Sequence, residues 1–431
     1  MNGYRLPQTL LLGVSSSAAQ IEGGETAGNW NEWCRMNRIS DKSSISRACD
    51  HWNRWKEDID IMAAMGVQTY RMGIEWSRIQ PKPGSIDYTA VNHYRQELEY
   101  LQTRGIRPLL TIHHFSNPLW FEKKGGFEAP ANVRYFLKYV GIIVNCFGDL
   151  VSDYVTFSEP NAYAFGGYAG QGFPPGENNP ITLRRVLSVM AGCHIRAYEK
   201  IHRMRTAMGY SDTKVGIALQ MKVFAPLQPS SVWMKHSAEL QRRAYQEAVA
   251  KAFLTGDFRG PLENLGHFKK GLYCDYLGIS YASRVHVSKP GEEQARPQDP
   301  KDDHGREIYH YGLELCMQEL VNTVQGQLPV WILSSGADDR KDAFRSLFLY
   351  DQLNVLAKTK LPVERYYCRS FTDSFEWLDG EKSRFGLVRV NFETQERTVK
   401  KSGRFFREIV AAGGVTPDMA ERYVKGEKYH K

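Results

Sequence analysis

The sequence predicts an α/β fold, a single (β/α)8 TIM barrel that takes up residues 1–431 as one domain. Short runs of β-branched and aromatic residues alternate with longer amphipathic stretches, and eight such runs follow one another along the chain. No low-complexity linker and no internal repeat divides them. Eight strand–helix units make a closed barrel of parallel strands, and loop insertions commonly carry single barrels beyond about 250 residues.

Each predicted strand is followed by enough residues to hold a helix. The strands are expected at Leu10–Val14, Thr69–Ile74, Arg107–His113, Asp153–Phe157, Lys214–Met221, Tyr276–Tyr281, Pro329–Leu333 and Val363–Phe371. Amphipathic stretches between them predict helices at Trp55–Met65, Tyr88–Arg104, Asn132–Phe147, Leu187–Met208, Trp233–Phe253, Tyr311–Gln325 and Ala343–Lys358. The Pro-, Gly- and Asp-rich stretch Lys289–Gly305 is expected to form one exposed loop and not a domain boundary.

Composition restricts the class of protein. A hydrophobic share of 42% with 24% charged residues is typical of a soluble globular domain. No apolar stretch reaches the ~20 residues of a membrane span, so no membrane partner is expected. The run Leu10–Val14 is too short and poorly flanked for a secretion signal, and we interpret it as a first core strand. Seven cysteines without a C-x-x-C pair predict reduced thiols and a cytoplasmic location.

The formal charge of +8 does not by itself predict a nucleic-acid partner. Lys and Arg are scattered, and no basic run is interleaved with aromatic residues, so we expect a solvated surface and no nucleic-acid binding. The 12 histidines show no metal-ligand spacing, so no metal and no cofactor are expected. An aromatic share of 12% suits a cleft in which sugars stack on rings, although most of these rings are expected in the core.

Polar residues follow nearly every predicted strand. In a barrel of this kind the active site lies at the carboxyl ends of the strands. The residues there are Gln20, Arg71, His113, His114, Ser158, Glu159, Tyr281, Ser334 and Arg369. So many polar groups in equivalent positions indicate a functional site and not only structural requirements.

Eight segments, in order and over nearly the whole chain, resemble the motifs of glycoside hydrolase family 1. They are Leu12-Gly13-Val14 through Gln20-Ile21-Glu22-Gly23, Cys49-Asp50-His51 with Lys56-Glu57-Asp58, Tyr70-Arg71 with Trp76-Ser77-Arg78-Ile79, Thr111-Ile112-His113-His114-Phe115, Thr156-Phe157-Ser158-Glu159-Pro160, Trp331-Ile332-Leu333-Ser334-Ser335-Gly336, Asp373-Ser374-Phe375-Glu376-Trp377 and Arg384-Phe385-Gly386-Leu387-Val388. The fifth and sixth resemble the two catalytic motifs, written T-F-N-E-P and I-T-E-N-G. The resemblance implies a β-glycosidase with a carbohydrate substrate.

The resemblance also assigns roles to individual residues. It makes Glu159 the general acid/base, and it makes Arg71 and Tyr281 the residues that flank and orient the nucleophile. Residues implied to grip the hydroxyls of the non-reducing sugar are Gln20, His114, Glu376 and Trp377. Because enzymes for 6-phosphorylated sugars lack the glutamate at position 376, its presence favours a neutral hexose.

Four departures from the family pattern fall at this site. Ser334 stands where the family has its nucleophilic glutamate, and Ser158 replaces the asparagine that contacts the sugar 2-hydroxyl. Ser280 replaces another asparagine, and Arg369 replaces the tryptophan beneath the sugar. Relative to the family, the pocket gains two positive charges. We therefore expect phosphate or another anion near Arg71, Arg369 and Ser334.

These departures leave several mechanisms open. Retention needs two carboxyl groups, and a serine alkoxide has no activating base here. Inversion with Glu159 as acid needs either a base for water, for which Asp338 and Asp339 are the nearby acids, or a nucleophile that arrives ionised. A phosphorylase reaction, or its reverse, fits the charge change better than hydrolysis. A further option places a carboxylated sugar against Arg369.

Two alternatives to an altered mechanism remain. The first is an ordinary retaining β-glucosidase that carries an engineered Glu→Ser change, made as a glycosynthase or substrate trap. The second is a non-catalytic carbohydrate-binding protein. The sequence leaves the sugar, the aglycone and the oligomeric state open, with a homo-oligomer among the options.

Overall fold

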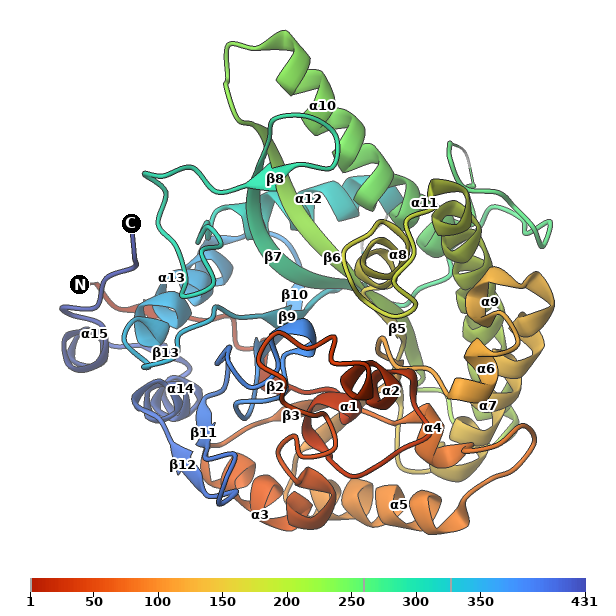
Figure 1. The fold of residues 1–431 in the computed structure, drawn as a ribbon. Coiled ribbons are helices and arrows are strands. Elements are labelled where there is room, and N and C mark those ends of the chain that lie inside the picture. Colours follow the sequence, from red (N-terminus) through yellow and green to blue (C-terminus); the bar gives the residue numbers. More distant parts are fainter. Residues whose placement is uncertain (1, 259, 326–327) are drawn as a thin grey trace.

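The computed structural model describes residues 2–258, 260–325 and 328–431, and it confirms the predicted (β/α)8 barrel (Figure 1). The barrel strands are parallel, each pairs with the next, and β10 pairs with β2 to close the ring. They are β2 (Leu11–Ser15), β3 (Thr69–Gly73), β4 (Arg107–His113), β5 (Asp153–Ser158), β6 (Lys214–Pro226), β7 (Leu277–Val287), β9 (Val330–Ser335) and β10 (Val363–Arg369). All eight predicted strands are present, although β6 and β7 extend beyond their predicted ends at Met221 and Tyr281.

The helices predicted between the strands surround the barrel. They are α3 (His51–Ala64), α5 (Tyr88–Thr103), α7 (Val133–Phe147), α9 (Pro180–Ala207), α10 (Val232–Arg242), α11 (Ala248–Thr255), α12 (Gly312–Val324) and α13 (Arg345–Lys358). Helix α9 begins seven residues before the predicted start at Leu187. Asn179 explains this difference, because its side chain accepts hydrogen bonds from the backbone N–H groups of Ile181 and Thr182 and caps the helix.

The remaining elements complete the chain. They are β1 (Tyr4–Arg5), α1 (Ala18–Ile21), α2 (Asn29–Arg35), α4 (Trp76–Ile79), α6 (Leu119–Glu122), η1 (Gly126–Glu128), η2 (Pro130–Asn132), α8 (Pro160–Tyr168), η4 (Trp377–Asp379), β11 (Val388–Val390), β12 (Arg397–Val399), α14 (Lys401–Ala412), β13 (Gly414–Val415) and α15 (Pro417–Tyr423). Strand β1 pairs with β13, so the two ends of the chain lie on the same side of the molecule (Figure 1).

The predicted helix Trp233–Phe253 is interrupted. It consists of α10, the π-helical segment η3 (Arg243–Glu247) and α11. Strands β6 and β7 continue past the barrel as a paired extension, and α10 projects beside it (Figure 1). The predicted loop Lys289–Gly305 contains a short strand, β8 (Glu293–Gln294), that pairs antiparallel with the end of β7.

Aromatic and charged side chains fill the barrel interior at the amino ends of the strands. Trp331 stacks on Tyr276 with ring centroids 3.7 Å apart, and the guanidinium of Arg365 lies 3.6 Å from the Trp331 ring. Arg365 also forms a buried ion pair of 2.7 Å with Asp153. These side chains fill the barrel at this end, so a ligand site is expected at the carboxyl ends.

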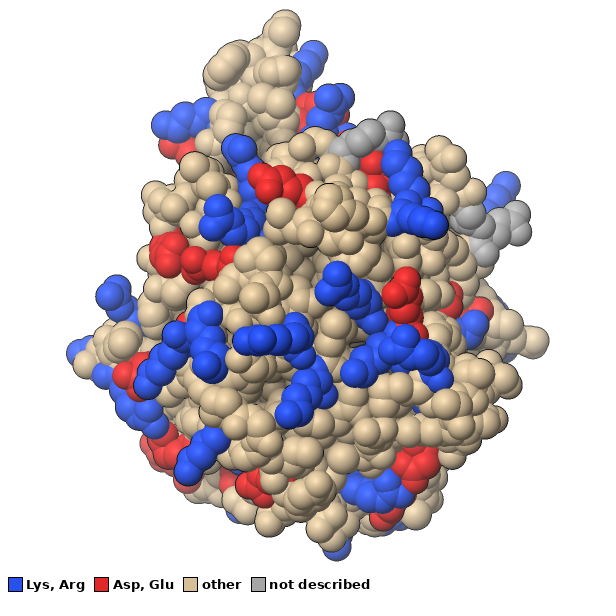
Figure 2. Space-filling view, turned by 90° about the vertical axis from the view of Figure 1, so that its right-hand side faces the viewer, with Lys and Arg blue, Asp and Glu red and all other residues tan. Residues whose placement is uncertain are grey.

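Basic side chains outnumber acidic ones on the face shown in Figure 2, which is the side of the molecule where α9 lies. Exposed residues of α9 contribute Arg184, Arg185, Arg196 and Arg203. Acidic side chains are interspersed among them (Figure 2). No helix in the described part of the chain is long and apolar enough to cross a membrane. All seven cysteines are free thiols.

Candidate active site

A cavity of about 280 Å³ opens at the carboxyl ends of the barrel strands. Eight of the ten predicted site residues line it: Gln20, Arg71, His114, Glu159, Ser334, Arg369, Glu376 and Trp377. The other two lie next to it. Ser158 is fully buried behind Arg71, and the Tyr281 hydroxyl donates a hydrogen bond to the backbone carbonyl of Tyr309. The fold thus gathers residues from distant segments into one pocket.

Glu159 follows the last residue of β5 and precedes α8. Its backbone lies in the left-handed region, with φ at 51°, and its N–H donates to the carbonyl of Ala218 at 2.7 Å. The side-chain Oε2 accepts a 2.7 Å hydrogen bond from Nε2 of Gln220, and the Gln220 amide oxygen in turn accepts from the Tyr245 hydroxyl. This network holds the carboxyl group in the cavity, at a depth where it is only 9% exposed.

Gln220 is a further residue of the cavity that was not predicted. It lies on β6, and its side chain lines the cavity beside Glu159. Its position near the carboxyl end of the predicted strand Lys214–Met221 was the one sequence feature that could have indicated a site residue. Its importance follows only from the contact with Glu159.

Arg71 bonds the residues directly before Glu159 and Ser334, which are Ser158 and Leu333. It donates from Nη2 to Ser158 Oγ at 2.6 Å and from Nη1 to the Leu333 carbonyl at 3.0 Å. Its Nε donates to Thr111 Oγ1 at 3.1 Å. All three acceptors are uncharged. Among the described residues no carboxylate lies within ion-pair distance, and burial lowers the pKa of the Arg71 guanidinium from its usual range.

Arg369, which was expected to hold an anion together with Arg71, has a carboxylate partner of its own. Its Nη2 is paired with Oε2 of Glu376, and its guanidinium lies 4.1 Å from the centre of the Phe385 ring. The other oxygen of Glu376 accepts a 2.7 Å hydrogen bond from Ser374. The extra positive charge is therefore compensated within the pocket, by the carboxylate that the family resemblance assigns to sugar binding.

The remaining sugar-gripping candidates have defined partners. Gln20 donates to the Phe375 carbonyl at 2.8 Å and accepts from Ser17 at 2.9 Å. Burial, with Arg71 next in importance, lowers the pKa of His114 well below its usual range, so this imidazole is neutral. Its ring lies 5.7 Å from the ring of Trp377, which forms part of the cavity wall. These are neutral polar and aromatic surfaces, as carbohydrate binding requires.

The two acids considered as bases for water, Asp338 and Asp339, do not line the cavity. Asp339 accepts hydrogen bonds of 2.8 Å from the backbone N–H groups of Ala343, Phe344 and Arg345, at the start of α13. Asp338 is fully buried and accepts from the Arg384 backbone N–H at 2.6 Å. Both therefore have structural roles. The prediction that one of them activates water in the cavity is wrong.

Two residues at the cavity entrance were not predicted. His304 and Arg306, from the loop after β7, line the cavity together with Asp379 of η4. We call these three residues the mouth. The side chains of His304 and Arg306 are 42% and 45% exposed, in contrast to the buried Arg71 and Glu159. No pattern in a loop sequence indicates which residues line a cavity, so these two could not be predicted.

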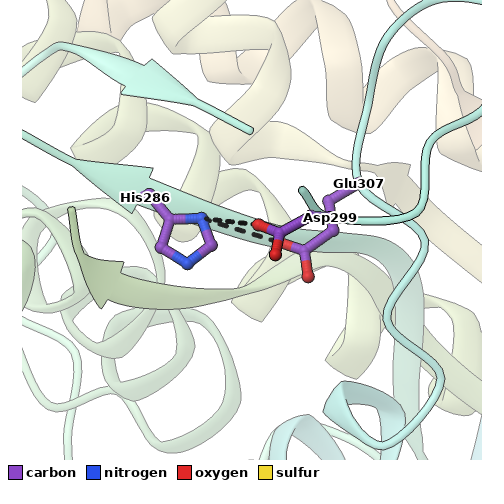
Figure 3. A group of neighbouring side chains, drawn as sticks. All are labelled: His286, Asp299 and Glu307. Atoms are coloured by element: carbon purple, nitrogen blue, oxygen red, sulfur yellow. Dashed lines mark ion pairs between the residues drawn. The ribbon is translucent and has the colours of Figure 1, made fainter. Parts of the chain in front are cut away.

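One group of three potential metal ligands occurs among the described residues: His286, Asp299 and Glu307 (Figure 3). His286 Nδ1 lies 3.6 Å from a carboxylate oxygen of each acid. Both acids already have cationic partners, because Arg284 pairs with Glu307 at 2.5 Å and Arg296 pairs with Asp299 at 3.1 Å. The charges balance without a divalent ion, so this cluster fits a structural role better than a metal site.

Comparisons with known proteins agree with this geometry. The family model described as Glycosyl hydrolase family 1 matches residues 3–270 and 264–415. The chain is 27% identical to a β-galactosidase of Pyrococcus woesei, with 97% of this chain and 100% of the relative covered. It is 28% identical to β-glucosidase A of Thermotoga maritima, with 96% and 100% covered.

Solved structures give the same result. The β-glycosidase from Pyrococcus horikoshii superposes with a TM-score of 0.87 at 28% identity, and the match covers 98% of each chain. The family 1 β-glucosidase from Thermotoga maritima in complex with isofagomine lactam also gives 0.87, at 25% identity, with 96% of this chain and 100% of that chain covered. Both the sequence and the fold are thus similar over nearly the full length.

Proposed function

This chain belongs to glycosyl hydrolase family 1, a family of enzymes, and we propose that it processes β-glycosides with an external anion as nucleophile. Glu159 is the general acid in this proposal. The anion, with inorganic phosphate as the first candidate, binds beside Ser334 and Arg71, where the family resemblance expects the nucleophilic carboxylate.

The environment of Arg71 carries the proposal. Its guanidinium is held by Ser158 and Leu333, the residues directly before Glu159 and Ser334. A buried guanidinium without a carboxylate partner is costly, and an anion in this place would remove much of that cost. The Ser334 side chain lines the same cavity and offers a hydroxyl donor.

The other carboxylates of the cavity are unsuited to activating water. Besides Glu159, the lining contains Glu376 and Asp379. Glu376 is bonded to Arg369 and Ser374, and Asp379 is bonded to His304 and Ser383. Inverting hydrolysis requires a free base on the face opposite the acid. A nucleophile that is already ionised does not need one.

The proposed reaction balances as follows. Glu159 gives its proton to the glycosidic oxygen, and the bond from that oxygen to the anomeric carbon breaks. A hydrogen phosphate oxygen forms the new bond from the opposite face, which gives an α-glycosyl phosphate and the free aglycone. The proton of the bound hydrogen phosphate then returns to Glu159. The reverse reaction forms a β-glycoside from an α-glycosyl phosphate.

Phosphate dependence tests the proposal. Aryl β-glucosides and β-galactosides are incubated with phosphate or with sulfate at equal ionic strength, and products are followed by ¹H and ³¹P NMR. We expect an α-glycosyl phosphate only with phosphate, and its loss in Glu159→Gln. Hydrolysis at the same rate in sulfate, or turnover that survives Glu159→Gln, would contradict the mechanism.

A second candidate is a carbohydrate-binding protein without catalysis. It is favoured by the pairing of Glu376 with Arg369 and by the serine at position 334. Measurable sugar binding without turnover under any of these conditions would support it. The free cysteines fit the cytoplasmic location that we propose. We also propose that the chain binds neither nucleic acid nor membranes, since the basic side chains are interspersed with acidic ones.

A further inference from the structure

The mouth offers hydrogen-bond donors to whatever group lies outside the reacting bond. Because Glu159 and Arg71 are buried at the base of the cavity, the sugar that reacts lies deep in it, and the leaving group extends toward the half-exposed His304 and Arg306. Their exposure puts these two residues on the solvent side of the cavity, where the proposed function expects the aglycone.

Both side chains have donors to spare. His304 uses Nδ1 for Asp379, at 3.1 Å, and its Nε2 has no hydrogen-bond partner within the described part of the chain. Arg306 uses Nε and Nη2 for Asp302, at 3.1 and 3.0 Å. Its Nη1 group makes no hydrogen bond to any described residue, and its guanidinium lies 5.0 Å from the centre of the Phe385 ring. The free N–H groups of Arg306 Nη1 and, when the imidazole is protonated, the N–H of His304 Nε2 are thus available at one edge of the pocket.

The loop that carries these residues is fixed in place. Glu307, next to Arg306, pairs with Arg284 of β7, and Ser283 donates to the Glu307 carbonyl. Asp299 lies beside the same cluster (Figure 3). Backbone hydrogen bonds at Asp302 and Asp303 tie the loop to Arg306 and to the segment after β9. The donors at the mouth are therefore positioned before a ligand binds, which lowers the entropic cost of binding.

The charge of the cavity also favours an acidic ligand. Its lining contains three arginines and His304 against the carboxyl groups of Glu159, Glu376 and Asp379. Asp302, which pairs with Arg306, adds a further carboxylate beside the lining. When Glu159 carries the proton that it gives to the leaving group and His304 is protonated, the cationic groups exceed the anionic ones by one. A positive cavity attracts anions and rejects cationic aglycones.

We infer that the aglycone of the natural substrate carries a carboxylate or a comparable anionic group, which His304 and Arg306 bind at the mouth. This inference rests on the proposed function for the placement of the reacting bond. It concerns binding, so it can be tested without turnover.

The test uses pairs of ligands that differ in one charge. The 4-carboxyphenyl β-glucoside and β-galactoside are each compared with their carboxamides, by calorimetric titration of Glu159→Gln and by kcat/KM of the unmodified protein. We expect the carboxylate to bind about tenfold more tightly, the lower end for a charge-assisted hydrogen bond at a half-exposed site. Arg306→Met should abolish most of this preference, and His304→Gln part of it.

Arg340→Met is the matched control. Arg340 is also half-exposed and lies close to Asp338, but it does not line the cavity. Its substitution should leave the preference unchanged. Equal binding of carboxylate and carboxamide, no binding of either carboxylate, or a preference that survives Arg306→Met would overturn the inference. A preference in binding with no turnover would instead refute the proposed mechanism alone.

Discussion

Breaking the ion pair between Arg369 and Glu376 should lower the stability of the protein and raise its affinity for a sugar. In Arg369→Met the methionine keeps much of the aliphatic length of the side chain but removes the guanidinium. Glu376 is 2% exposed as a side chain and would lose its cationic partner, keeping only the hydrogen bond from Ser374. The same change frees one carboxylate oxygen toward the cavity.

The magnitudes follow from burial. Leaving a buried charge unpaired costs about 3–5 kcal/mol, and we reduce this to about 1–2 kcal/mol because Arg369 is 30% exposed and water can reach the site. With an unfolding entropy of about 2.1 cal/mol/K per residue, the melting temperature should fall by about 1–2 °C. One regained hydrogen bond from a sugar hydroxyl to the carboxylate is worth about 1.5 kcal/mol, or roughly tenfold in affinity.

The assay pairs thermal unfolding with calorimetric binding of isofagomine lactam, a neutral sugar analogue. Arg369→Met should unfold slightly earlier and bind more tightly. The control Glu376→Gln removes the carboxylate charge itself and should bind more weakly. If Arg369→Met weakens binding as much as Glu376→Gln does, Arg369 contacts the sugar directly and the reasoning is wrong.

Three further predictions concern other residues. Ser334→Glu alone should give only weak phosphate-independent hydrolysis, and adding Arg369→Trp should raise it at least tenfold; a fully active single variant would favour the reading of an engineered retaining enzyme. Burial raises the pKa of Glu122 to about 7. In the folded protein its carboxyl group therefore keeps a proton that the unfolded chain releases near pH 4.5. The free energy of unfolding falls as the pH rises from 4.5 to 7. Glu122→Gln should therefore be more stable above pH 7 by about 3 kcal/mol in denaturant titrations, and an equal loss of stability with pH in both proteins would contradict this. Asp379 raises the pKa of His304, with Arg306 and Asp302 as the other charges nearby. The preference for a carboxylated aglycone should therefore be largest at low pH and fall as the pH rises through that pKa. A preference that does not change with pH would exclude a role for His304.

The barrel could be predicted because each strand and helix has a local signal. The eight strands are short apolar runs, and their order along the chain determines their order in the sheet. The break within Trp233–Phe253 could not be predicted, because the π-helical segment η3 has no distinctive composition. The early start of α9 had a signal in Asn179, a residue that commonly caps helices.

The candidate site was predictable at strand ends but not in loops. Glu159 directly follows β5, Ser334 is the penultimate residue of β9 and Arg71 lies within β3, so their convergence follows from the fold. The pairing of Arg369 with Glu376 depends on how seven residues turn between β10 and η4, and no sequence pattern specifies that turn. The inward orientation of His304 depends likewise on the ion pairs that fix its loop.

Arg71 also connects the barrel strands to one another. It belongs to β3, and its guanidinium binds groups on β4, β5 and β9, so a single side chain joins four of the eight strands across the carboxyl end. Its position is thus set by the fold and does not require a carboxylate at position 334. Replacing Arg71 by an uncharged residue would remove three hydrogen bonds from the barrel. A substitution at position 334 removes none of them. In the evolution of such a protein, the nucleophile can therefore be lost while the positive charge stays, and new ligands are selected from those that tolerate it.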